Sequence, residues 1–251
     1  MTEGGFSDHF PDAAAGYRAY RPTYPDELFA YLAGIVPSRE RAWDCATGNG
    51  QAALKLAPHF REVIATDGSE KQIAQAEQAE NIDYRIATAE HSGLDDTSID
   101  LITVAQALHW FDYDAFSKEV HRVLKPKGIL TAWTYNLLTC DPGVDACVNH
   151  FYDKIVGPYW PFERRDVETG YRDIQFPFDT LDAPPFAMTA SWTLVHLIGY
   201  LATWSAVAAY EKDKGTNPIA GITEELHELW GDPSKAKAVE WPLSVRIWRS
   251  S

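Results

Sequence analysis

The amino-acid sequence predicts an α/β fold built on a doubly wound sheet. A short apolar strand at residues 41–43 runs through a glycine turn into a helix at residues 51–57. Between about residues 40 and 135, five strand-like segments alternate with helical segments, which is typical of βαβ proteins. Residues 243–248 alternate apolar and polar side chains and are expected to form a final strand.

The composition favours a soluble globular protein. Of the 251 residues, 45% are hydrophobic, which is enough to bury a sizeable core. The formal net charge of −14 argues against nucleic acid as a partner, because phosphate contacts need a basic face. The N-terminus resembles no export signal, and the most apolar long segment, residues 194–210, is short for a membrane span.

The cysteines are odd in number and lack zinc-type spacing, so reduced thiols in a cytoplasmic protein are expected. They are Cys45, Cys140 and Cys147. The sequence shows no other cluster of metal-ligating side chains, and no metal is expected. Together with the charge and the absence of a membrane segment, this predicts a small-molecule substrate, with neither nucleic acid nor membrane as a partner, and a monomer or homodimer.

The turn Gly48-Asn49-Gly50 is expected to hold a ligand. Glycine permits a positive φ and close approach to the backbone, and the helix that follows aims unpaired N–H groups at the turn. The spacing Gly48-x-Gly50-x-x-Ala53 matches the weak dinucleotide fingerprint G-x-G-x-x-G/A. An ordinary strand–turn–helix without a ligand is the other simple interpretation.

A longer pattern, Asp44-x-Ala46-x-Gly48-x-Gly50, resembles the first motif of the class I S-adenosylmethionine (SAM) dependent methyltransferases. That family most often has glycine where this chain has Ala46. Asp44 favours this interpretation, because a carboxylate would face the pyrophosphate of a dinucleotide, whereas it can face the amino group of SAM directly or through water. The resemblance assigns Asp44, Ala46, Gly48 and Gly50 to cofactor binding.

The second expected strand, residues 63–67, ends on a carboxylate. Asp67 follows Gly50 by 17 positions (67 − 50), close to the roughly 20 at which an acid meets ribose hydroxyls in βαβ nucleotide folds. Its two acceptor oxygens match two vicinal hydroxyl donors. Gly68 and Ser69 lead into the next helix and complete this part of the expected cofactor site. A solvated acid at a strand end is the alternative.

A third strand is expected at residues 83–86. In the methyltransferases the turn after this strand borders the adenine. The resemblance therefore assigns Thr88, Ala89 and Glu90 to the cofactor site, with Thr88 in place of the usual acidic residue.

The fourth strand, residues 99–105, is a nearly continuous apolar run, as in buried parallel sheets. It delivers Gln106, His109 and Trp110 to its carboxyl end, where ligands bind in open α/β sheets. Gln106 is assigned to the cofactor site. His109 is expected either to act as a general base or to hydrogen-bond the backbone and shape the pocket.

Further segments extend the resemblance. Residues 121–128 resemble the methyltransferase segment R-x-L-K-P-G-G, and about residues 40–135 are similar to the methyltransferase type 11 group. Residues 125–128 are expected to form a turn that closes a helix, and residues 129–133 the next strand. The segments 17–25, 106–111 and 199–205 look like the trans-aconitate methyltransferase-like small-molecule subgroup. The resemblance implies a mostly parallel, seven-stranded Rossmann-like sheet with a final antiparallel strand.

One domain covering residues 1–251 is expected, with a helical and aromatic cap. Its expected parts are an N-terminal arm and helix (1–38), a SAM-binding core (40–135), a cap insertion (141–187), and C-terminal strands and a helix (188–251).

The resemblance implies SAM as methyl donor and in-line transfer, which depends on alignment more than on chemical groups. His109 and Tyr20 are the expected catalytic residues, and aromatic faces such as Tyr20 and Trp110 would stabilise the sulfonium cation. The expected substrate-binding residues are Tyr17, Arg21, Trp110, Trp160 and Trp204.

Arginines in the arm and cap suggest a carboxylate acceptor, because guanidinium pairs carboxylates in a bidentate fork. They are Arg18, Arg21, Arg164, Arg165 and Arg172. A carboxylate is already ionised at neutral pH, so its O-methylation needs no general base. The alternatives are a non-catalytic SAM-binding protein and an NAD(P)-dependent oxidoreductase.

Overall fold

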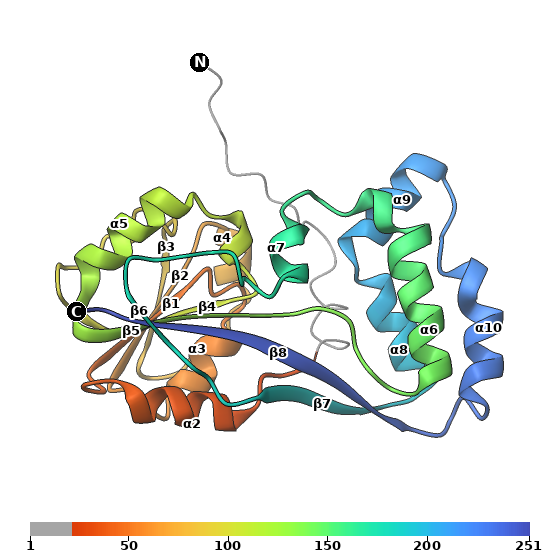
Figure 1. The fold of residues 1–251 in the computed structure, drawn as a ribbon, viewed down its shortest axis with the longest axis horizontal. Coiled ribbons are helices and arrows are strands. Elements are labelled where there is room, and N and C mark those ends of the chain that lie inside the picture. The colour runs from red at the N-terminus through yellow and green to blue at the C-terminus, as the bar shows by residue number, and fades with distance from the viewer. Residues whose placement is uncertain (1–21) are drawn as a thin grey trace, which may run out of the picture.

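The computed structural model describes residues 22–251 and contains one mixed sheet in the order β3-β2-β1-β4-β5-β8-β6, with β7 also paired to β8 (Figure 1). The strands are β1 (Arg41–Cys45), β2 (Glu62–Asp67), β3 (Ile82–Ile86), β4 (Ile99–Ala105), β5 (Leu124–Tyr135), β6 (Asp179–Leu181), β7 (Phe186–Trp192) and β8 (Lys237–Arg249). The first five strands pair in parallel, and β8 runs antiparallel to β5. The predicted fold class is confirmed.

Two short strands share the outer edge of β8. β6 pairs with the carboxyl end of β8, where Asp179 lies opposite Arg249, and β7 pairs with its amino half, where Phe186 lies opposite Leu243. Residues 243–249 of β8 pair with β5 on the other side. The sheet therefore has seven positions in its strand order, and the seventh is divided between β6 and β7.

Helices cover both faces of the sheet (Figure 1). They are α2 (Asp26–Ile35) and α3 (Gln51–Leu56) on one face, and α4 (Glu70–Ile73) and α5 (Tyr113–Val123) on the other. α2 buries Leu28 and Phe29 in one apolar cluster, which also contains Trp133. α5 buries Phe116 against Trp43 in a second cluster. Burial on both faces explains why β4 is apolar along most of its length.

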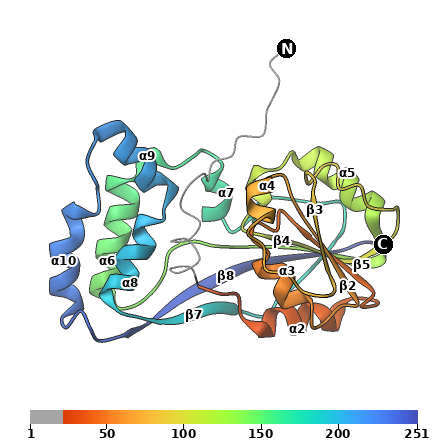
Figure 2. The ribbon, with the colours of Figure 1, turned by 180° about the vertical axis from the view of Figure 1, so that it is seen from behind.

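A helical layer stands beyond the carboxyl end of β5, and the long strands β7 and β8 connect it to the sheet (Figures 1 and 2). It contains α6 (Pro142–His150), a π-helical turn (Phe151–Ile155), a 3-10 turn (Gly157–Tyr159), α7 (Arg164–Glu168), α8 (Leu194–Ala202), α9 (Ser205–Lys214) and α10 (Ala220–Trp230). Helices α6 and α7 belong to the expected cap insertion (141–187), whereas α8, α9 and α10 belong to the expected C-terminal part (188–251). None of the helices described in residues 22–251 is long and apolar enough to cross a membrane.

The segment 125–128, expected as a turn that closes a helix, lies inside β5. The pairing of β4 with β5 shifts register between Ile99 and Leu101, so that Ile99 lies opposite Leu124 and Leu101 opposite Ile129. Lys127 has a positive φ of 61°. The four residues form a bulge, which lets the strand start directly after α5.

Candidate active site

The turn between β1 and α3 contains three residues in the left-handed region, with φ of 54° at Ala46, 58° at Gly48 and 86° at Gly50. A Cβ on Gly50 would lie 2.2 Å from the hydroxyl of Tyr84, so glycine is required there by packing. A Cβ on Gly48 would meet nothing closer than Gln72 Oε1 at 4.0 Å. Gly48 therefore leaves an open approach to the backbone, as a ligand cradle requires.

Asp44 lies at the end of β1, fully buried beneath this turn. Its carboxylate accepts hydrogen bonds from the hydroxyls of Thr47 and Thr103. Burial raises the pKa of Asp44 to about 6, and the two hydroxyls act in the opposite direction. In this arrangement the Asp44 carboxylate holds the turn from below and exposes no surface to a ligand.

Asp67 ends β2 beside the turn and is 8% exposed. Its carboxylate accepts hydrogen bonds from the backbone N–H groups of Gly48 and Ser69, both at 2.8 Å. Gly68 lies between Asp67 and Ser69 in the connection to α4. The two bonds fix the carboxylate at the carboxyl end of the sheet and tie the glycine turn to the neighbouring strand.

The connection after β3 contributes a mixed surface. Thr88 is exposed and forms an isolated bridge with His91, whereas Ala89 is buried. Glu90 accepts a hydrogen bond at 3.2 Å from the backbone N–H of Asp112, which caps α5. This loop is thereby anchored to α5 and lies on the same edge of the sheet as Asp67.

Gln106 directly follows β4 and has a positive φ of 55°. Its side-chain carbonyl accepts hydrogen bonds from the Thr134 hydroxyl at 2.7 Å and the Tyr135 N–H at 2.9 Å, and its amide donates to the Tyr135 carbonyl at 3.1 Å. The side chain thus joins the ends of β4 and β5. Because the side-chain amide of Gln106 is engaged in these bonds, a cofactor would contact Gln106 through its backbone.

His109 lies in the short turn Leu108–Trp110 and is 9% exposed. Its Nδ1 lies 2.9 Å from the hydroxyl of Tyr171, and its ring centroid is 4.8 Å from that of Trp110. Burial lowers the pKa of His109 to about 4, and the nearby positive charge of Arg164 acts in the same direction. At neutral pH the imidazole is uncharged. Trp110, with 41% of its surface exposed, forms an open aromatic wall beside it.

Arg164 opens α7 and stacks on the indole of Trp160, with its guanidinium carbon 4.3 Å from the ring centroid. Nε donates to the hydroxyl of Tyr152 at 3.0 Å, and Nη2 donates to Oδ1 of Asn136 at 3.1 Å. Trp204 lies behind Trp160 in the apolar core and is 5% exposed, so it supports Trp160 and does not form an exposed wall.

Four of the expected site residues lie outside the residues that the structure describes, because they precede residue 22. They are Tyr17, Arg18, Tyr20 and Arg21. Sequence reasoning also missed Tyr171, Tyr152 and Asn136. Their positions carry no motif, and only the folded chain brings them to His109 and Arg164. Among residues 22–251, no three His, Cys, Asp or Glu side chains gather in a way that could hold a metal ion.

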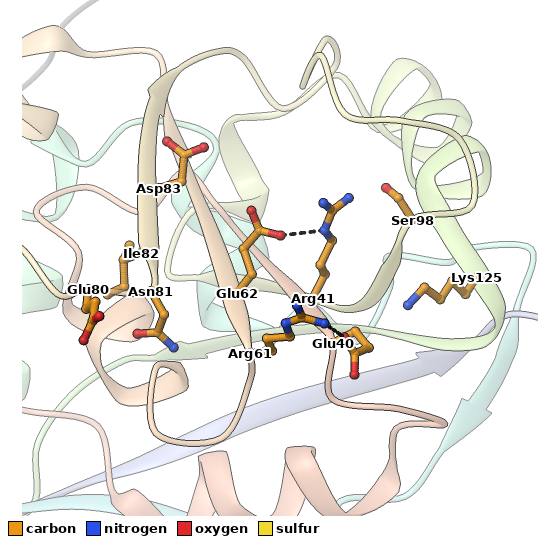
Figure 3. Close-up of a pocket in the computed structure, with 10 residues that line it drawn as sticks. All are labelled: Glu40, Arg41, Arg61, Glu62, Glu80, Asn81, Ile82, Asp83, Ser98 and Lys125. Carbon is orange, nitrogen blue, oxygen red and sulfur yellow. Dashed lines mark hydrogen bonds and ion pairs between the residues drawn. The ribbon is translucent and has the colours of Figure 1, made fainter.

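A separate hollow of about 910 Å³ opens at the opposite edge of the sheet, where the strands begin (Figure 3). Charged side chains line it, and four of them form two ion pairs: Arg41 with Glu62 at 2.6 Å, and Arg61 with Glu40 at 3.1 Å. It lies away from the glycine turn and His109. The candidate active site is therefore the carboxyl edge of the sheet, facing the helical layer.

The chemistry of this edge suits SAM. The open turn at Gly48 gives a ligand access to the backbone, and Asp67 beside it presents acceptor oxygens of the kind that bind ribose hydroxyls. Trp110 offers an exposed aromatic face, which can attract a sulfonium cation. The strand order and the site both fit the class I methyltransferase fold that the sequence predicts.

Comparison with known proteins also indicates a methyltransferase. Residues 43–132 match the family model described as "Methyltransferase domain". A Dictyostelium discoideum protein named "Putative methyltransferase" is 36% identical over 250 residues, covering 96% of this chain and 95% of the relative. The Saccharomyces cerevisiae protein named "Probable S-adenosylmethionine-dependent methyltransferase CRG1" is 29% identical, covering 94% and 95%.

Among solved structures, the "Putative Type II Methyltransferase" from Anaeromyxobacter dehalogenans superposes with a TM-score of 0.87 at 43% identity, covering 92% of this chain and 98% of that one. The chain belongs to the class I SAM-dependent methyltransferase family. The recognition of that family from the glycine turn and the segment 121–128 is confirmed. None of these relatives is named for trans-aconitate, so the resemblance to that subgroup stays a prediction.

Proposed function

We propose that this SAM-dependent methyltransferase acts on a small, soluble acceptor and transfers the methyl group to a carboxylate oxygen. One observation carries the choice of acceptor: the uncharged His109 lies in the electrostatic field of Arg164, a cation with no carboxylate partner in the described chain. A cation without an acidic partner is suited to bind an anionic substrate group.

When bound, SAM supplies an electrophilic methyl group on a sulfonium. The chain's own residues then hold the two reactants in line, since orientation alone can supply several kcal/mol of the barrier. We assign cofactor binding to the turn at Gly48, to Asp67 and to the loop that contains Thr88 and Ala89. Trp110, whose ring packs beside His109, offers the exposed aromatic face for the sulfonium.

The lowered pKa of His109 weakens it as a general base at neutral pH, because the protonated form is too acidic to be formed readily. A phenol or an ammonium group would need such a base. A carboxylate nucleophile, with a pKa near 4, is ionised already and needs none. We therefore assign His109 to shaping the pocket rather than to proton removal.

An acceptor panel tests the proposal. Mono-, di- and tricarboxylic acids, phenols and amines are supplied with SAM, and release of S-adenosylhomocysteine is measured with wild type, Arg21→Lys and His109→Ala. Methylation of a carboxylic acid that persists in His109→Ala is expected. Activity confined to phenols or amines and abolished in His109→Ala would refute the carboxylate and make His109 the base.

A further inference from the structure

A second cavity, of about 340 Å³, lies in the helical layer next to Arg164. Its walls come from the π-helical turn, the 3-10 turn and α7, and include the aromatic side chains Tyr152, Trp160 and Phe162. This volume is at the small end of the range for ligand pockets. Phe162 is 73% exposed, and the guanidinium of Arg165 lies 4.9 Å from its ring centroid.

Arg164 has donors to spare in this cavity. A guanidinium has five N–H donors, and only Nε and Nη2 hydrogen-bond to residues of the described chain. Stacking on Trp160 fixes the plane of the guanidinium while leaving its edge for a ligand. Arg164 is half-buried, and none of its donors pairs with a carboxylate in residues 22–251. A guanidinium held in place with spare donors suits a ligand that brings acceptors.

The charges of the cavity limit that ligand. Besides Arg164 and Arg165, it is lined by Asp153 and Glu168, so its formal charges cancel. Glu168 accepts a hydrogen bond from the Tyr152 hydroxyl at 2.8 Å, and Arg164 donates to that same hydroxyl. An acceptor with several carboxylates would meet these two acids, whereas a single carboxylate can be held at Arg164.

We propose that this cavity binds the acceptor as a monocarboxylic acid with an aromatic or conjugated body, its carboxylate on Arg164 and its planar part between Trp160 and Phe162. The inference rests on the proposed function, which it narrows. Arg164 also acts on His109 electrostatically and hydrogen-bonds Asn136 directly after β5, so the same guanidinium links the cavity to the carboxyl edge of the sheet.

Calorimetry tests the binding without turnover. Cinnamate, its neutral analogue cinnamamide, and citrate are titrated into the protein saturated with S-adenosylhomocysteine. Cinnamate is expected to bind at least tenfold more tightly than either of the other two. Arg164→Gln should weaken cinnamate at least tenfold, and Trp160→Leu should weaken it several-fold. Arg61→Gln is the control, since Arg61 pairs with Glu40 at the opposite edge of the sheet and does not line the cavity.

The inference would be overturned if cinnamate did not bind, if cinnamamide bound equally well, or if citrate bound more tightly. Equal effects of Arg164→Gln and Arg61→Gln on cinnamate binding would also overturn it. If Arg164→Gln fails to fold, as judged by circular dichroism, Arg164→Lys replaces it; it keeps the charge but loses the fork, and an intermediate loss is expected. Unchanged affinity in Arg164→Lys would exclude a bidentate contact.

Methyl transfer is measured separately. Cinnamate binding that depends on Arg164 without methylation of any carboxylic acid would sustain this site and refute the proposed function. If carboxylic acids are methylated equally well by wild type and Arg164→Gln, the proposed function stands and this binding site is refuted.

Discussion

The hydroxyl of Tyr171 lies 2.9 Å from Nδ1 of His109, across 62 positions of sequence. Tyr171 is fully buried and has a positive φ of 57°, in the segment that follows α7. His109 follows β4, so the bond ties the segment after α7 to the carboxyl edge of the sheet. Because this hydrogen bond engages one named ring nitrogen, it fixes which way the imidazole faces.

Tyr171→Phe should lower kcat several-fold while changing KM for SAM little, because the imidazole loses the bond that orients it. A buried nitrogen left without its partner should also cost about 1–3 kcal/mol of unfolding free energy. Tyr113→Phe is the control, since the Tyr113 hydroxyl bonds Asp166 in α7 without touching His109. Steady-state kinetics measure kcat and KM, and urea unfolding measures the stability of both variants. An equal loss of kcat in Tyr171→Phe and Tyr113→Phe would contradict the role of Tyr171 in orienting His109.

The lowered pKa of His109 predicts a pH dependence of stability. The folded pKa is about 4 and the ordinary value is 6.5, so between these pH values the unfolded chain binds a proton that the folded chain does not. Stability is therefore lost as pH falls from 6.5 toward 4, by on the order of 3 kcal/mol. Asp44, whose pKa is raised to about 6, acts in the opposite direction between pH 6 and 3.8.

His109→Gln isolates the histidine contribution. The variant lacks the titrating group, so its unfolding free energy should fall less than that of wild type between pH 6.5 and 4.5 in urea titrations. His121→Gln, which replaces an exposed histidine stacked on Phe178, should follow wild type. Parallel curves for wild type and His109→Gln would show that His109 is not held neutral by burial.

Sequence patterns predicted the parts of the fold that depend on local spacing. The glycine turn, the acid ending β2 and the apolar β4 were visible because each needs a few residues in a fixed order. Tyr171 and Gln106 show where that reasoning stops: their partners, His109 and Tyr135, are distant in sequence, so no periodicity reveals the contacts. The bulge in β5 was missed because Lys125-Pro126-Lys127-Gly128 reads locally as a turn.

Asp67→Ala should weaken binding of S-adenosylhomocysteine by about 1.5–3 kcal/mol, the cost of losing hydrogen bonds to a charged acceptor. Part of that loss would come from the turn itself, because Asp67 also holds the N–H of Gly48. Asp83→Ala, at an exposed acid on β3 paired with Arg85, is the control and should bind like wild type. Calorimetry measures both, and unchanged affinity in Asp67→Ala would remove that residue from the site.

Asp100 is a buried acid at the edge of the sheet opposite Asp67, where it stabilises the fold. It is fully buried and accepts hydrogen bonds from Lys125, from the hydroxyl of Ser38 and from the backbone N–H groups of Glu40 and Arg41. Asp100→Ala should cost about 3–5 kcal/mol, because it leaves buried donors and a partly buried ammonium without their partner.

Arg61→Ala gives the comparison at the same edge of the sheet, since the ion pair of Arg61 with Glu40 is exposed in the hollow there (Figure 3). An exposed pair contributes about 1 kcal/mol or less. Urea unfolding of the two variants should therefore differ by at least 2 kcal/mol. A small loss in Asp100→Ala would mean that water replaces the carboxylate at the start of β1.

The two glycines of the turn should separate packing from ligand approach. Gly50→Ala places a Cβ 2.2 Å from the Tyr84 hydroxyl at a φ of 86°, so it should cost about 2–4 kcal/mol of stability in the absence of cofactor. Gly48→Ala meets only open space and should cost about 1 kcal/mol, from its left-handed backbone alone. Its Cβ would stand where a ligand approaches, so Gly48→Ala should lose affinity for S-adenosylhomocysteine at least tenfold despite the smaller loss of stability. Adding Tyr84→Leu to Gly50→Ala should restore most of the stability, because the clashing ring is removed. If Gly48→Ala binds as wild type does, the cofactor does not lie against this part of the turn.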